Sequence, residues 1–139
     1  MNNNIWENYS FKGEKQKSAL DYLNGLKSGL IEQTTGELTL ETEAVDAIIE
    51  GNPPKIAAIY KLFVAAPKLG NFRRKILTVA EYSEIGRFPV DIVNHFVDDF
   101  KYSNISETDF MKTITEILTS PNVKNSIENL FQQSIEYNR

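Results

Sequence analysis

The chain has 139 residues, of which 41% are hydrophobic and 24% are charged, and its formal net charge is −4. A chain of this length suits one core, so we expect residues 1–139 to fold as a single domain. The absence of cysteine excludes disulfides and thiolate metal sites. The negative charge disfavours a general nucleic-acid binder, although it permits a local basic patch.

The first ten residues do not have the character of a signal peptide, because they lack its basic and apolar regions. The longest apolar run, residues 56–66, is too short to span a bilayer and contains Lys61. We therefore expect a cytoplasmic protein with no membrane partner. Residues 1–12 are predicted to pack on the body as an N-terminal arm through four large side chains: Ile5, Trp6, Tyr9 and Phe11.

Apolar residues keep a helical period over residues 14–33, which predicts the first helix. Gly25 and Gly29 lie inside it, and each weakens a helix by up to about 1 kcal/mol relative to alanine, so the pattern allows a kink or break there. Residues 34–40 are predicted to form a loop. Thr42 is then expected to cap a short helix that ends at Gly51.

The central segment, residues 51–89, is predicted to form two helices at the nucleus of the core. Asn52 and Pro53 suit a helix start. Gly70 suits a helix end, and Asn71 suits the cap of the next helix. In the first of these two central helices, one face would carry Ile56, Ile59, Tyr60 and Phe63, which recur at three- and four-residue steps. We therefore expect Phe63 to be buried.

The remaining chain is predicted to form three more helices. Pro89 opens the fifth, in which Phe96 is expected to be buried. Ser106 caps the sixth, with Asp109 at its third position. Pro121 opens the last helix.

The predicted fold class is therefore all-α, with about seven helices joined by short capped turns. Helices that start with proline begin near Pro53, Pro89 and Pro121, about 36 and 32 residues apart, and such a period is typical of helix-pair repeats. Because residue types do not repeat, the sequence leaves two architectures open. These are a compact helical bundle and a short, irregular, solenoid-like array of helix pairs.

Charge is segregated in blocks along the chain. Six acidic residues occur without a base: Glu32, Glu37, Glu41, Glu43, Asp46 and Glu50. Six basic residues then occur without an acid between Lys55 and Lys75. Such blocks can steer a charged partner, or they can neutralise each other across neighbouring elements. Both readings stay open.

His95 is the only histidine, and Asp91 and Asp99 flank it at four-residue steps, which would place all three on one helix face. A histidine beside carboxylates can act as a general base, but it more often stabilises a helix surface. The chain has no Gly-x-Ser-x-Gly motif and no glycine-rich phosphate loop. We therefore predict no catalytic residue, no metal site and no cofactor.

A small, acidic, cysteine-free helical chain of this kind is similar in general character to bacterial toxin-immunity proteins. This resemblance implies a non-enzymatic protein-binding module. The most concrete hypothesis is an inhibitor that neutralises a basic toxin, such as a nuclease, through the acidic segment between Glu32 and Glu50. The sequence does not specify the oligomeric state.

Two alternative functions stay open. Arg73, Arg74 and Lys75 lie at the start of a predicted helix, where anions bind well, and they would suit a nucleic-acid-associated regulator. The third reading is a small hydrolase centred on His95.

Overall fold

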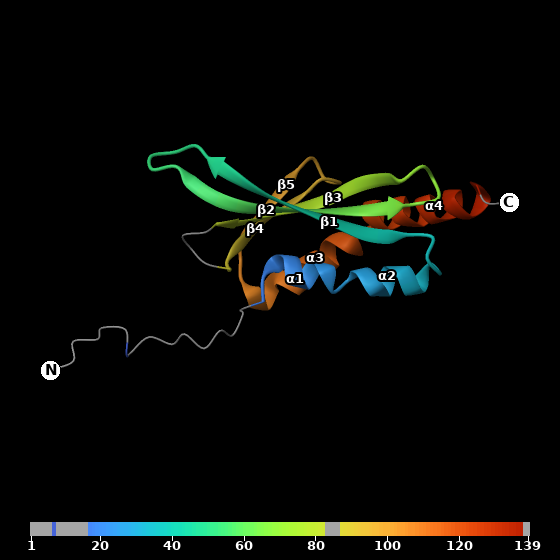
Figure 1. Cartoon of the computed structure of the whole chain (residues 1–139), viewed down its shortest axis with the longest axis horizontal. Helices are drawn as coiled ribbons and strands as arrows, with labels where there is room; N and C mark the ends of the chain where they lie inside the picture. The colour runs from blue at the N-terminus through green and yellow to red at the C-terminus, as the bar shows by residue number, and fades with distance from the viewer. Residues whose placement is uncertain (1–6, 8–16, 83–86, 138–139) are drawn as a thin grey trace.

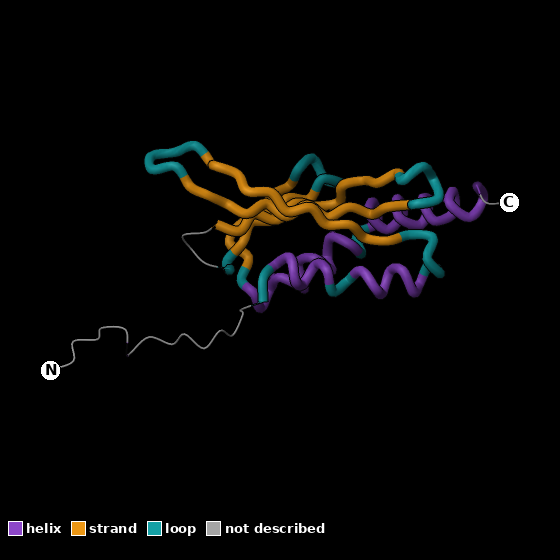
Figure 2. Tube along the Cα trace, in the orientation of Figure 1, coloured by secondary structure: helices purple, strands orange, loops and turns teal. Residues whose placement is uncertain are grey.

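The computed structural model describes Glu7 and residues 17–82 and 87–137, and it shows an α+β fold. Five strands form one antiparallel sheet in chain order: β1 (Thr39–Ile49), β2 (Lys55–Ala66), β3 (Phe72–Tyr82), β4 (Val90–Asn94) and β5 (Phe100–Ile105). Four helices flank it in sequence: α1 (Ala19–Asn24), α2 (Lys27–Gln33), α3 (Glu107–Leu118) and α4 (Pro121–Tyr137). Figures 1 and 2 show α1, α2 and α3 packed on one side of the sheet, and Val123 and Leu130 of α4 belong to the same core. We call the other side of the sheet the open face.

The prediction of an all-α bundle or solenoid-like array is therefore wrong, and the central apolar segment shows why. It forms β2, in which Tyr60, Leu62 and Val64 face the helices and are at most 6% exposed. Phe63, which lies between Leu62 and Val64 in sequence, points to the open face and is only partly buried. A segment that is apolar on both faces has no clear period, so a buried strand and a buried helix look alike in sequence.

Hairpin turns occupy positions that were interpreted as helix caps or helix interiors. Gly70 and Asn71, with φ of 65° and 60°, join β2 to β3. Asp98 and Asp99, with φ of 45° and 54°, lie in the turn between β4 and β5, inside the predicted fifth helix. Consecutive residues with positive φ are typical of tight hairpin turns, so these pairs end the strands.

The helices outside the sheet follow the sequence more closely. Ser106 caps α3 and accepts a hydrogen bond of 3.3 Å from the backbone N–H of Asp109, as predicted. Helix α4 begins at Pro121, and the first predicted helix breaks at Gly25, the C-cap of α1. The predicted packing of residues 1–12 falls outside the described residues, apart from the exposed Glu7. Within the described part, no helix is long and apolar enough to cross a bilayer.

The core lies between the sheet and the helices. Leu62 of β2 pairs with Leu77 of β3, and both are fully buried. The fully buried Phe110 of α3 packs beneath the sheet. Its ring centroid lies 5.8 Å from that of Tyr22 in α1 and 5.6 Å from that of Phe88. This aromatic cluster holds helices from the two ends of the chain against each other.

A β-bulge in β3 sets which side chains face the helices. Between Leu77 and Lys75 the register with β2 shifts by one residue, so Ile76 has no partner of its own in β2. Ile76 and Leu77 are both fully buried. The alternation of side chains is inverted before the bulge, because one extra residue exchanges the two faces. As a result, Arg74 faces the helices, whereas Arg73 lies on the open face.

We predict that replacing Phe110 by alanine lowers the free energy of unfolding by about 3–5 kcal/mol, because the change leaves a large cavity in the core. Replacing Phe63 by alanine should cost clearly less, since its ring is partly exposed. Urea unfolding followed by circular dichroism measures both losses. Equal losses for the two variants would contradict this assignment of the core.

Candidate functional site: a groove between β3 and α4

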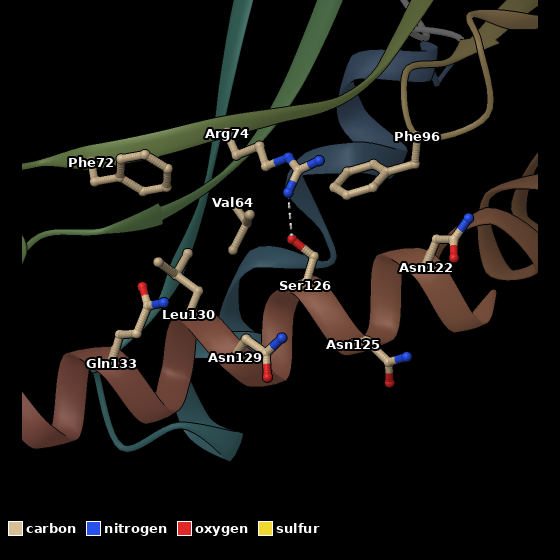
Figure 3. A pocket seen from close by; sticks show the side chains of 10 residues that line it. All are labelled: Val64, Phe72, Arg74, Phe96, Asn122, Asn125, Ser126, Asn129, Leu130 and Gln133. Carbon is tan, nitrogen blue, oxygen red and sulfur yellow. Dashed lines mark hydrogen bonds between the residues drawn. The ribbon is translucent and has the colours of Figure 1, made fainter.

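A groove of about 550 Å³ runs between the start of β3 and helix α4 (Figure 3). Ten residues line this α4 groove: Val64, Phe72, Arg74, Phe96, Asn122, Asn125, Ser126, Asn129, Leu130 and Gln133. Val64 and Leu130 are buried and form its apolar floor. Among the described side chains that line it, none is acidic, and Arg74 is the one that carries a charge. The groove therefore favours neutral or anionic ligands.

Two contacts orient the guanidinium of Arg74. Its Nη1 donates a hydrogen bond of 2.9 Å to Oγ of Ser126, and its central carbon lies 4.1 Å from the ring centroid of Phe96. Figure 3 shows Arg74 reaching from the strand toward Ser126 on the helix. A guanidinium carries five N–H donors in a planar fork, so one bond to Ser126 leaves most of them for a ligand.

Amide side chains line the helical side of the groove. Asn122, Asn125, Asn129 and Gln133 all come from α4. A helix turns about 100° per residue, so these positions fall within an arc of about 80°. Each amide offers both a donor and an acceptor. The helix therefore presents a continuous stripe of neutral hydrogen-bonding groups beside Ser126.

His95 belongs to a second cluster, on the open face. Its Nε2 lies 2.6 Å from Oγ1 of Thr78, and its Nδ1 lies 2.7 Å from Oδ1 of Asp99. Hydroxyl, imidazole and carboxylate are thus in line, as in a nucleophile–base pair. However, Thr78 lies within β3 and is paired with β2 and β4, so the ladder occupies the nearby backbone donors that an oxyanion would need. The contacts therefore hold the turn after β4 against the sheet.

The prediction that Asp91 and Asp99 share a helix face with His95 is wrong, because His95 follows a strand. Asp91 instead accepts hydrogen bonds from the Tyr82 hydroxyl at 2.8 Å and from the Asn104 backbone N–H at 3.0 Å. Burial alone would raise the pKa of Asp91. These two bonds and the neighbouring Lys101 outweigh burial and lower that pKa. Asp91 therefore anchors β5 and is not a partner of the histidine.

Three of the six acidic residues predicted as a partner contact form ion pairs within the chain. Glu41 and Glu43 form ion pairs with Arg73 on the open face. Glu37 pairs with Lys68 at 2.8 Å. The other three form no ion pair with any described residue: Glu32, Asp46 and Glu50. Half of the predicted contact is thus neutralised within the chain.

The predicted basic helix start is also wrong, because Arg73, Arg74 and Lys75 belong to a strand. The structure places Arg74 in the α4 groove and the other two on the open face. Arg73 also lies over the ring of Phe63, 4.0 Å from its centroid. The three cations therefore do not make a continuous patch for a phosphate backbone.

Sequence reasoning missed the α4 groove. The sequence did contain one signal for this groove. Its amides Asn125, Asn129 and Gln133 follow at steps of four residues, which places them in a row on one helix face, and such a row is unusual. Phe72 and Arg74 gave no such signal, because they approach α4 only after β3 pairs in the sheet. Arg74 and Ser126 are 52 positions apart in sequence.

No protein-family model, no curated protein and no solved structure matches this chain. A function must therefore be inferred from the geometry of its own residues. The α4 groove is one feature that can bind another molecule, and the exposed end of the β1–β2 hairpin is another.

Two tyrosines on the sheet give a prediction for alkaline pH. Burial, together with the hydrogen bond from its hydroxyl to Glu81, raises the pKa of Tyr60 to about 12. Burial and the bond to Asp91 raise the pKa of Tyr82 to about 12. The ordinary value is about 10. Because the folded state favours the neutral phenols, their contribution to stability is complete below pH of about 10 and is lost as pH rises through about 12.

The measurement is the free energy of unfolding in urea at several pH values across this interval. Tyr82→Phe removes one titrating group, so this variant should lose less stability than the wild type between the two pKa values. Tyr137→Phe is the matched control, because Tyr137 is 70% exposed and should not change the slope. Identical slopes for the wild type and Tyr82→Phe would contradict the prediction.

Proposed function

We propose that this chain is a protein-binding module that docks a basic partner through the outer part of its β1–β2 hairpin. We call residues 45–59 the arm. Figure 1 shows this hairpin extending beyond the helices at one end of the molecule. The exposed apolar side chains of the arm are the observation that carries this proposal.

The arm exposes β-branched side chains that the core does not use. Ile48 and Ile56 pair across the hairpin and are 73% and 56% exposed. Val45 is 45% exposed. Large apolar side chains gathered on one exposed element are typical of a docking surface. They support a contact with another protein.

The backbone of the arm supports the same proposal. β1 is an edge strand, since β2 is its only neighbour in the described sheet. An edge strand presents backbone N–H and C=O groups on its outer side, and another chain can pair with these groups. The backbone of β1 therefore offers main-chain hydrogen bonds to a partner beside the exposed side chains of the arm.

The charge of the arm favours a basic partner. Asp46 and Glu50 lie within it, and neither forms an ion pair with a described residue. Lys55 is its single base. Of the six acidic residues that the sequence predicts as the partner contact, this proposal keeps these two. The hypothesis that the partner is a basic toxin stays a prediction within this proposal.

The test begins with a photo-reactive amino acid placed at position 48 of the full chain in its own cells. The same group at Lys112, an exposed position on α3, is the control. We expect one discrete adduct from position 48 that position 112 does not give. An adduct between two copies of this chain alone would overturn the proposal, because it would make the arm a self-association surface.

Binding of the cross-linked protein is then measured by surface plasmon resonance. Ile48→Asp should weaken it by about tenfold or more, because the change puts a charge into an apolar contact. Asp46→Lys should mainly slow association, and this effect should shrink as salt shortens the Debye length to about 8 Å. Glu116→Lys, on the exposed surface of α3, is the matched reversal that should change little. Equal affinities for wild type and Ile48→Asp would overturn the proposal.

A further inference from the structure

Helix α4, which forms one side of the α4 groove, lies away from the arm, at the other end of the sheet (Figure 1). We propose that it binds an extended peptide segment with an acidic group, which lies along α4 with that group at Arg74. This is a second binding site, and it does not depend on the arm. The amide stripe, the orientation of Arg74 and the absence of lining acids carry the proposal.

The spacing of the amides matches that of an extended main chain. Asn125, Asn129 and Gln133 follow at steps of four residues, which is about 6 Å along a helix. In an extended peptide, groups that point the same way repeat every two residues, or about 6.7 Å. A side-chain amide has the same donor and acceptor as a peptide unit, so each can pair with main-chain N–H and C=O groups.

The length of the groove also fits a peptide. From Asn122 to Gln133 the helix rises about 16 Å, which an extended segment of about five residues would span. The exposed ring of Phe72 and the buried side chains of Val64 and Leu130 provide apolar contacts along this path. A compact ligand would use only part of the stripe.

Charge decides which peptides fit. Arg74 is already oriented by Ser126 and Phe96, so little side-chain freedom is lost when it binds a carboxylate. A single-stranded nucleic acid of the same length would bring several phosphates to a groove whose lining has one cation. The groove therefore favours an acidic peptide over nucleic acid.

The test uses the full chain and an array of random nine-residue peptides. We expect the bound peptides to be enriched in Asp and Glu. Fluorescence anisotropy then gives the affinity of one such peptide for each variant. Arg74→Ala and the double variant Asn129→Ala/Gln133→Ala should each weaken binding by about tenfold or more. Lys124→Ala, on the opposite side of α4 from the stripe, should stay within about twofold of the wild type.

Amide resonances and salt provide independent readouts. In a ¹⁵N spectrum, the side-chain NH₂ signals of Asn125, Asn129 and Gln133 should shift when the peptide is added. Arg74→Lys keeps the charge but loses the planar fork, so it should bind more weakly than the wild type. Circular dichroism and the unfolding midpoint show whether each variant is folded.

Three results would overturn the proposal. The first is no acidic enrichment among the bound peptides. The second is equal affinity for the wild type and the double amide variant. The third is a twelve-nucleotide single strand of DNA or free glutamate that binds as tightly as the peptide, because the site would then recognise a different chemistry. Ile48→Asp should leave peptide binding unchanged, so this site and the arm are tested separately.

Discussion

The register shift at Ile76 decides how the two faces of the sheet are used. Without the extra residue, strict alternation back from Leu77 would direct Arg73 toward the helices and Arg74 away from them. With it, Arg74 reaches α4, and Arg73 joins Glu43 on the open face. One extra residue in β3 thus separates a cation that is neutralised within the chain from a cation that lines a groove.

The register shift at Ile76 also positions Phe96, which lines the α4 groove. The carbonyl oxygen of Ile76 accepts a hydrogen bond of 3.0 Å from the backbone N–H of His95. Thr78 and Asp99 hold the imidazole on its two sides. Phe96, the next residue, is therefore brought over the guanidinium of Arg74. His95 thus helps to position the α4 groove through the turn after β4.

Ion pairs neutralise several charges of the open face, whereas the acids of the arm form no ion pair with a described residue. Arg73 pairs with two glutamates, and Lys101 lies 3.3 Å from Asp91. Such exposed pairs contribute little to stability, but they reduce the net charge that a partner meets. Unpaired acids of the described chain occur in the arm, and an oriented cation lies in the α4 groove. The surfaces proposed for binding are therefore at opposite ends of the sheet.

The sequence by itself determined the elements whose signals are local. Ser106 and Pro121 mark the starts of α3 and α4, and Gly25 marks the break after α1, because caps and breaks involve residues a few positions apart. Strand pairing decided the rest. The segment that became β2 is apolar on both sides, so its period does not distinguish a buried strand from a buried helix. It is a strand because its backbone N–H and C=O groups pair with those of β1 and β3, and only the tertiary structure provides these partners. The groove depends on this pairing as well, because Arg74 meets Ser126 only after β3 has its register and α4 has packed beneath it.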